Sequence, residues 1–328
     1  MPQLDRRTFV TALAGSVPAL AWPGRAGAQA WPARPIHVVV PFSAGGGTDI
    51  AARLIVERLA TQLGQSIVVD NKPGAATAIG VAAVTGAAPD GYTLLFSGST
   101  SYTVNPAVRA KLSYDPFTQL SPLALVARAP LVVVCGADSP YRTLDALVAQ
   151  AARKPGELNY ASFGPGSGPH LLSEMLAYAK GIKLTAIPYK GSAESTIAII
   201  RNDVAFGIDT LAAAAAQVKS GKMRALAVVS EKRSHFMPQV PSFGELGLSS
   251  ALFDAWYAFA GPARLPAAVS LALGTALKAT MADPELQQKL ARQFMEPVML
   301  GPDRMRAIMD EEITRYRAIV ARANIDIG

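Results

Sequence analysis

Short apolar runs rich in β-branched residues alternate with helical stretches along most of this chain, and this alternation constrains its fold more than any other feature. The runs have the length of strands, and the stretches between them have the length and periodicity of helices. The strand-like runs are residues 36–40, 66–69, 93–96, 131–135, 184–187, 204–208 and 225–229. The helical stretches are residues 50–63, 144–153, 170–179 and 194–200. Such alternation is typical of βαβ units, so we predict an α/β fold with mostly parallel sheets flanked by helices.

The length of the chain and a change of pattern near its end indicate two domains. Of its 328 residues, enough remain for two domains of ordinary size once residues 1–30 are set aside as a leader. Two segments, 120–130 and 253–262, look like crossings between domains, and the pattern that follows them is helical with almost no strand. Helices are expected there at residues 267–281, 284–293 and 302–323. We therefore predict one lobe from residues 31–123 together with 254–328 and an inserted second lobe from residues 124–253, which is the plan of a hinged, two-lobed binding protein.

The first thirty residues are laid out as an export signal. Arg6 and Arg7 precede a weakly apolar segment, and small residues ending at Ala30 are suited to cleavage before Trp31. The arginine pair resembles a twin-arginine leader, although Asp5 stands where Ser or Thr is usual, so the twin-arginine and general export routes both stay open. We expect cleavage near Ala30 and a periplasmic location.

The composition of the chain limits the kinds of molecule that it is expected to bind. The formal net charge is +7, but the basic residues are scattered and not interleaved with aromatic residues, so nucleic-acid binding has little support. A mild positive charge instead favours small anions. No segment after the leader is apolar over the length needed to cross a bilayer, and we expect a soluble monomer. The single cysteine, Cys135, excludes an internal disulfide and is expected to pack within a strand.

A glycine loop at residues 41–49 separates the first predicted strand from the first predicted helix. Gly45, Gly46 and Gly47 leave their backbone N–H groups uncovered by side chains, and the dipole of the following helix adds positive potential at the same point. The loop therefore predicts a binding site for an anion. A phosphate, a dinucleotide or a carboxylate could occupy it.

A second loop of the same kind lies in the middle of the chain. Residues 159–162 read as a short strand, Gly164 and Gly166 lie in the turn that follows, and His170 opens a helix. If the two loops face each other across a cleft, backbone donors from both lobes can hold one carboxylate, and a hinge motion can close on it. Taken singly, each loop could equally be an ordinary turn between a strand and a helix.

Nucleotide-binding motifs do not fit either loop. The dinucleotide fingerprint fails because Ile50 and Pro169 stand where the third glycine is required. The Gly221-Lys222 pair lacks both the upstream glycine and the following Ser or Thr of a Walker A loop. We therefore expect no nucleotide and no cofactor.

Ser167 and His170 leave one catalytic alternative, an exported serine esterase. Ser167 lies one position out of register with the Gly-x-Ser-x-Gly motif, and the sequence identifies neither an orienting acid nor an oxyanion hole. The histidines at positions 37, 170 and 235 do not share metal-ligand spacing with one another or with the cysteine, so no metal site is expected. We predict a protein that is not an enzyme and keep the esterase as the alternative.

Four short motifs follow one another along the chain. They are Pro-Phe-Ser-Ala-Gly-Gly-Gly-Thr-Asp at 41–49, Val-Asp-Asn-Lys-Pro-Gly-Ala at 69–75, Ala-Pro-Asp-Gly-Tyr-Thr-Leu at 88–94 and Pro-Tyr-Lys-Gly-Ser at 188–192. In this order they resemble the solute-binding proteins of tripartite tricarboxylate transporters, also called Bug proteins, over nearly the whole mature chain. The resemblance implies a two-lobed periplasmic-binding fold of type II-like plan. Such a protein captures a small organic acid by closure of its lobes and delivers it to membrane permease subunits. A periplasmic ligand sensor that presents its closed form to a signalling partner is a further alternative.

The resemblance also implies which residues bind the ligand. In this family the carboxylate is held by the first glycine loop and by the facing loop of the second lobe, largely through main-chain amides, small hydroxyls and bridging waters. Carried onto this chain, the first side is Phe42, Ala44, Gly45, Gly46 and Asp49, and the second side is Ser162, Gly164, Gly166, Ser167 and His170. For Asp49, capping of the helix and contact with the ligand both remain open.

Other candidates follow the ends of further predicted strands. Ser101 lies in a hydroxyl-rich loop, residues 97–102, that is expected to form a third wall of the pocket. Tyr189 and Asp209 follow strands of the second lobe, and Asp209 could bind an amine or a hydroxyl of the ligand. Lys190 could pair with a second ligand carboxylate or simply be solvated. Because aromatic residues are also expected near the pocket, the ligand could be a di- or tricarboxylate or an aromatic acid.

Overall fold

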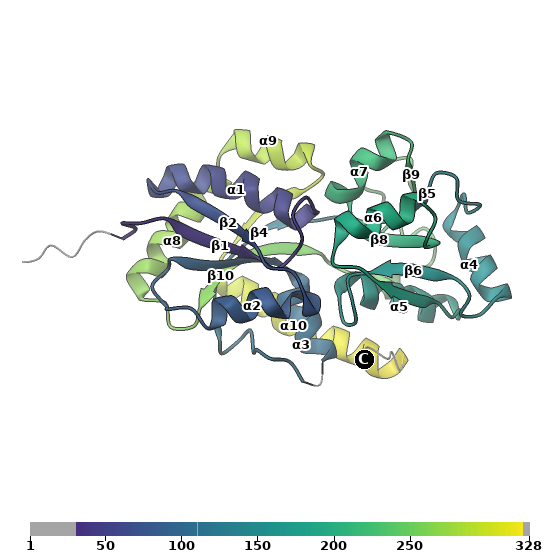
Figure 1. Cartoon of the computed structure of the whole chain (residues 1–328), viewed down its shortest axis with the longest axis horizontal. Helices are drawn as coiled ribbons and strands as arrows, with labels where there is room; N and C mark the ends of the chain where they lie inside the picture. Colours follow the sequence, from purple (N-terminus) through teal and green to yellow (C-terminus); the bar gives the residue numbers. More distant parts are fainter. Residues whose placement is uncertain (1–30, 110, 324–328) are drawn as a thin grey trace, which may run out of the picture.

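The strands of the protein form two separate sheets, each covered by helices (Figure 1). The computed structural model describes residues 31–109 and 111–323, so the expected leader at residues 1–30 lies outside the described residues. The first sheet contains β1 (Ile36–Val40), β2 (Ile67–Asn71), β3 (Thr93–Gly98), β4 (Leu120–Arg128), β10 (Trp256–Pro262) and β11 (Glu296–Leu300), in the order β11-β4-β10-β3-β1-β2. The second sheet contains β5 (Leu131–Gly136), β6 (Asn159–Ser162), β7 (Thr185–Pro188), β8 (Phe206–Thr210) and β9 (Met223–Val228), in the order β7-β6-β8-β5-β9.

Both sheets are mixed. In the first sheet β1 pairs in parallel with β2 and β3, whereas β10 is antiparallel to both β3 and β4, and β11 is antiparallel to β4. In the second sheet β6 is parallel to β7 and β8, whereas β5 is antiparallel to β8 and β9. The two-lobed α/β fold is confirmed. The prediction of mostly parallel sheets is wrong outside the βαβ units, because β4, β5, β10 and β11 pair only as antiparallel strands. Of these, β4 and β10 are the strands by which the chain leaves the first sheet and returns to it.

Helices connect the strands and cover the sheets. They are α1 (Gly47–Leu63), α2 (Ala78–Thr85), α3 (Asn105–Val108), α4 (Leu144–Arg153), α5 (Gly168–Lys180), α6 (Ser192–Ile200), α7 (Leu211–Lys219), α8 (Ala267–Met281), α9 (Pro284–Arg292) and α10 (Pro302–Ala323). Short helical turns lie at Ala75–Thr77, Thr100–Val104 and Ser249–Ala251. No helix among residues 31–109 and 111–323 is long and apolar enough to cross a membrane.

Two boundaries differ from the sequence prediction in ways that matter for the binding site. The first helix begins at Gly47 instead of Ile50, and the fifth begins at Gly168 instead of His170. Glycine residues therefore supply N–H groups to the first turn of both helices.

The strand β11 was not predicted from the sequence, because it is a half-buried edge strand that contains Pro297 and lacks a strong apolar pattern.

The chain passes between the two sheets at two neighbouring points. It leaves the first sheet after Arg128, beyond the boundary expected at residue 123, and returns to it at Trp256. The two crossing segments are bonded to each other, because the N–H of Ala129 donates to the carbonyl of Ala255 at 2.8 Å and Arg128 forms an ion pair with Asp254. The connection between the sheets is thus a pair of short neighbouring segments at the ends of paired strands, which is the geometry a hinge requires.

The last helix, α10, packs against both halves of the molecule, which are the part built around the first sheet (the first half) and the part built around the second sheet (the second half). Met305 and Met309 contribute to a core on the first sheet, and Tyr316 contributes to the core of the second. Between them Glu312 is buried and accepts hydrogen bonds from Trp256 Nε1 at 2.9 Å and from Thr103 Oγ1 at 2.8 Å. Burial raises the pKa of Glu312 to about 7. The α10 helix therefore contacts both hydrophobic cores, and its buried Glu312 carboxyl group lies between them, next to the segments where the chain crosses between the sheets.

Candidate functional site

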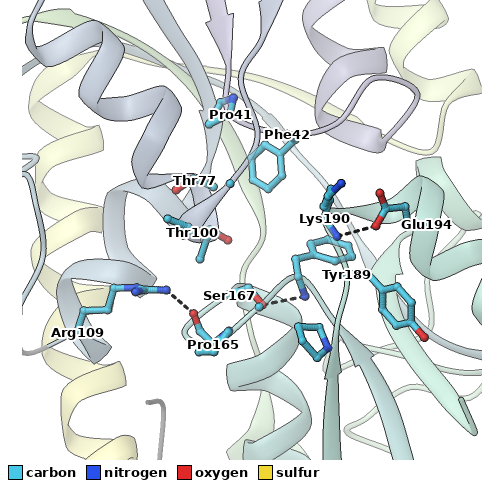
Figure 2. A pocket seen from close by; sticks show the side chains of 16 residues that line it. Pro41, Phe42, Thr77, Thr100, Arg109, Pro165, Ser167, Tyr189, Lys190 and Glu194 are labelled. Carbon is cyan, nitrogen blue, oxygen red and sulfur yellow. Dashed lines mark hydrogen bonds between the residues drawn. The ribbon is translucent and has the colours of Figure 1, made fainter.

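Two adjoining cavities open between the sheets. The large cavity has a volume of about 590 Å³, and the small cavity has a volume of about 60 Å³. Phe42 and Thr100 from the first half and Phe163 from the second half line both of them, so the cavities are neighbours. Figure 2 shows the large cavity, with Phe42 and Thr100 facing Ser167 across it. The site is therefore built from both halves of the molecule.

Two helices point their N-terminal ends at the small cavity from opposite halves. Gly46, Gly47 and Thr48 line it at the start of α1, and Gly168 and Pro169 line it at the start of α5. The first N–H groups of a helix have no partner within that helix, and the helix dipole makes this end positive. Two such ends at one cavity favour an anion, and binding of an anion by the glycine loops stays a prediction.

The two halves touch closely at Gly47. A Cβ atom at this position would collide with Oγ1 of Thr210 and would lie 2.9 Å from the hydroxyl oxygen of Tyr257. Thr210 is the N-cap of α7 in the second half. Nearby, the Ser43 hydroxyl donates to the carbonyl of Lys190 at 3.3 Å. Glycine is therefore required at position 47 by the approach of the two halves.

Asp49 organises the first glycine loop. Its carboxylate is buried and accepts hydrogen bonds from the N–H of Gly45 at 2.9 Å, from Arg53 Nε at 3.0 Å and from Asn71 Nδ2 at 3.0 Å. Although burial opposes ionisation, the hydrogen bonds from these three partners lower the pKa of Asp49. The same Asn71 amide donates to the carbonyl of Phe42 at 3.0 Å. Asp49 thus holds the loop in shape and lines neither cavity.

Ser167 and His170 organise the second glycine loop in a similar way. The Ser167 hydroxyl caps α5, accepting the N–H of Phe163 at 3.2 Å and that of His170 at 3.4 Å. His170 Nδ1 accepts the N–H of Gly166 at 3.0 Å. A nucleophilic serine needs an imidazole nitrogen that can accept its proton. Because Nδ1 accepts a backbone N–H, the neutral ring carries its own proton on Nε2, and in this arrangement neither nitrogen can take a proton from Ser167. The geometry suits a structured loop better than a catalytic pair.

The structure brings together about half of the residues expected at the site. Those that line one or both cavities are Phe42, Gly46, Gly164, Ser167, Tyr189 and Asp209. Those that line neither cavity are Ala44, Gly45, Asp49, Ser101, Ser162, Gly166 and His170. Ala44 and Gly45 are exposed at the tip of the first loop, whereas the other residues in this group are buried behind the cavity walls. Ser101, for example, is hydrogen-bonded to Ser97 at 2.6 Å and to Thr77 at 2.8 Å. Contact of any of these residues with a ligand stays a prediction.

Sequence reasoning missed one wall of the large cavity. Gly74 and the three residues that follow it line this cavity, and Ala75, Ala76 and Thr77 have φ values of 46°, 47° and 83°. Non-glycine residues rarely adopt such values, which cost energy and persist where the surroundings hold them. Arg109 lines the same cavity and was also missed. The motif at 69–75 marked the start of this wall, but its residue types do not indicate that the chain turns into the cleft.

Asp209 places a carboxylate at the small cavity. It is buried at the end of β8 and accepts the N–H of Thr210 at 2.7 Å. Burial raises the pKa of Asp209 to about 6, in spite of hydrogen bonds from Ser192 and Thr210 that favour its ionised form. The cavity that receives two positive helix ends therefore also contains an acid that titrates just below neutral pH.

The fold and the cleft define a two-lobed solute-binding protein. The chain belongs to the tripartite tricarboxylate transporter family of receptors, whose model matches residues 51–325. It is 35% identical to protein BugT of Bordetella pertussis over 294 residues, which cover 89% of this chain and 90% of that protein. The resemblance predicted from the sequence motifs is thus confirmed.

Solved structures of similar proteins agree with this assignment. The periplasmic binding protein BugD has a TM-score of 0.86 at 30% identity, with 90% of this chain and 99% of that chain covered. An R. palustris protein solved with adipate has a TM-score of 0.86 at 32% identity and the same coverage. MatC from Rhodopseudomonas palustris, with bound malate, has a TM-score of 0.83 at 27% identity, covering 88% of this chain and 99% of that chain. Because the family consists of solute-binding receptors, the prediction that this chain is not an enzyme is confirmed.

Replacement of Gly47 by alanine should force the two halves apart. The added methyl group would collide with Thr210, so we expect a larger radius of gyration by small-angle X-ray scattering than for the wild-type protein in the same buffer. Adding Thr210→Ala removes the colliding hydroxyl and should bring the radius back toward the wild-type value. Gly274→Ala, at a position in α8 with open space for a methyl group, is the matched control. An unchanged radius in Gly47→Ala would contradict this role of the glycine.

Proposed function

We propose that this protein captures a small organic carboxylate between its lobes outside the cytoplasm and delivers it to the membrane permease subunits of a tripartite tricarboxylate-type transporter. The convergence of the α1 and α5 N-termini on one cavity, from opposite halves, carries the proposal. Similar proteins with adipate and with malate support a carboxylate as the ligand.

The chemistry of the cavity matches such a ligand. The first N–H groups of α1 and the N–H of Gly168 at the start of α5 can donate to carboxylate oxygens, and Thr48 and Thr100 line the same space with their hydroxyls. These donors are neutral, so an anion can enter without displacing a resident counter-ion. The remaining oxygens of the ligand can be satisfied by bridging waters.

Closure of the lobes completes the site in this proposal. The sequence predicts lobes of residues 31–123 with 254–328 and of residues 124–253. Because β4 stays in the first sheet as far as Arg128, we place the first crossing at residues 129–130, and we place the second at residues 253–255. Opening would separate the two helix ends, so a carboxylate that bridges them binds the closed form more tightly than the open one. That difference in affinity is what would shift the protein toward the closed form that a permease recognises.

The remaining parts of the proposal concern location and partners. We infer export by the signal at residues 1–30, cleavage near Ala30 and a periplasmic monomer. Family membership and the periplasmic binding proteins among its relatives support this location. Loss of uptake of the bound acid in a strain without this protein would test the permease partner, whereas a signalling receptor would leave uptake unchanged.

Purified protein should be stabilised by organic acids. A ligand at 100 times its dissociation constant stabilises the folded state by roughly 2.7 kcal/mol, which raises the melting temperature by several degrees. A thermal-shift screen of mono-, di- and tricarboxylates and aromatic acids, with ester substrates assayed in parallel, would measure this. Ester turnover that is lost in Ser167→Ala, without any acid raising the melting temperature, would reject the proposal.

The affinity for a carboxylate should increase as the pH falls. Because the pKa of Asp209 lies at about 6, lowering the pH from about 7.5 to about 5.5 protonates it and removes a negative charge from the small cavity. The measurement uses a monocarboxylate with a pKa of about 4, which stays ionised over this range. We expect binding to tighten by about threefold or more, measured by isothermal titration calorimetry.

Asp209→Asn should remove most of this pH dependence. Glu312 also titrates in this range, so wild type and variant are compared at each pH to isolate the contribution of Asp209. Asp138→Asn changes an exposed carboxylate that lines neither cavity and serves as the control. An undiminished pH dependence in Asp209→Asn would show that this acid does not act on the ligand.

A further inference from the structure

The charged residues of the large cavity are distributed unevenly. Of the described residues that line it, Arg109 and Lys190 are positive and Glu194 is negative. The carboxylate of Glu194 accepts the backbone N–H of Lys190 at 3.1 Å, so a negative charge lies beside that lysine. Figure 2 shows Arg109 on the opposite side of the cavity from this pair. Arg109 therefore provides a positive charge away from Glu194.

The guanidinium of Arg109 is held in place by a buried amide. Its Nε donates to Asn105 Oδ1 at 3.2 Å, and Asn105 is fully buried. Nδ2 of Asn105 donates to the carbonyl of Ala76 at 2.7 Å and also contacts the hydroxyls of Thr77 and Tyr114, each at 3.1 Å. The arginine is thus fixed to the unusual Gly74–Thr77 wall, and little of its side-chain freedom remains to be lost when a ligand binds.

A terminal nitrogen of the same guanidinium contacts the second half of the molecule. An Arg109 terminal nitrogen donates to the carbonyl of Pro165, which lies in the second glycine loop (Figure 2). Guanidinium has five N–H donors, and a carboxylate is a stronger acceptor for them than a neutral peptide carbonyl. Arg109 can therefore exchange the Pro165 contact for a ligand carboxylate or add one to it.

The lining between Arg109 and the helix ends suits an aliphatic chain. Phe42 and Phe163 line both cavities, and Pro41, Pro188 and Tyr189 add apolar surface to the large one. A volume of about 590 Å³ is within the usual range for small-molecule sites. We propose that the ligand is an extended aliphatic dicarboxylate, whose first carboxylate lies at the α1 and α5 N-termini and whose second pairs with Arg109. The inference rests on the proposed function and narrows its ligand class.

The test compares acids that differ only in the second carboxylate. Linear dicarboxylates of about four to eight carbons and the monocarboxylates of equal length are titrated by calorimetry into wild type, Arg109→Gln and Arg292→Gln. With the best dicarboxylate, wild type should bind it about tenfold or more tightly than its monocarboxylate partner, because the pair adds a charge-assisted hydrogen bond. Arg109→Gln should abolish this preference and leave the monocarboxylate affinity within about threefold.

Arg292→Gln is the matched control. It removes the same charge from an exposed position at the end of α9 that lines neither cavity, so it should keep the wild-type preference. Equal weakening of mono- and dicarboxylates by Arg109→Gln would overturn the inference, since the arginine would then only hold the Pro165 loop. Wild-type affinities that do not distinguish the two series at any length would overturn it as well, with the proposed function intact. Failure of every acid to bind would reject the proposed function and this inference together.

Discussion

The architecture depends on the positive N-terminal ends of α1 and α5, which meet at one cavity from opposite sheets. At the start of α5, Pro169 has no N–H and the N–H of His170 donates to the Ser167 hydroxyl, so the N–H of Gly168 is left to face the cavity there, together with the first N–H groups of α1. Gly47 leaves no room for a Cβ atom, which would collide with Thr210 of the second lobe, and a Cβ atom at Gly168 would lie 3.2 Å from Oγ1 of Thr100. The paired crossing strands and the α10 helix then determine how the two ends approach each other, because together they connect the halves.

The polar side chains nearest the two loops mostly hold the backbone in position. Asp49 accepts the N–H of Gly45, Ser167 caps α5, and His170 accepts the N–H of Gly166. From the sequence alone, each of these side chains could be a ligand contact or a catalytic group. In the structure, each accepts a hydrogen bond from a backbone N–H group of its own loop. In the proposed function, this division leaves main-chain groups to bind the anion and the cavity walls to set specificity; Asp209 and Arg109, of opposite charge, lie in those walls.

The sequence predicts the local parts of this structure and misses the long-range ones. A strand, a glycine turn and the start of a helix together span about a dozen residues, so the sequence alone predicts both glycine loops. The alternation of such units along the chain predicts the α/β class. The antiparallel placement of β4, β10 and β5 depends on pairing between distant segments, and β11 has a proline and a half-buried face that weaken its pattern. Arg109 and the Ala75–Thr77 wall were missed because positive φ values at such residues have no sequence signature, and their place in the cleft depends on Asn105.

Hydrogen–deuterium exchange with and without a bound carboxylate tests most directly whether the two loops act as one clamp. The ligand would be the acid that gives the largest thermal shift, at a concentration that saturates the protein. The account predicts slower amide exchange in both residues 42–49 and residues 163–170, because each helix end donates to the same ligand and closure shields both. Protection of only one loop, or of neither, would contradict it.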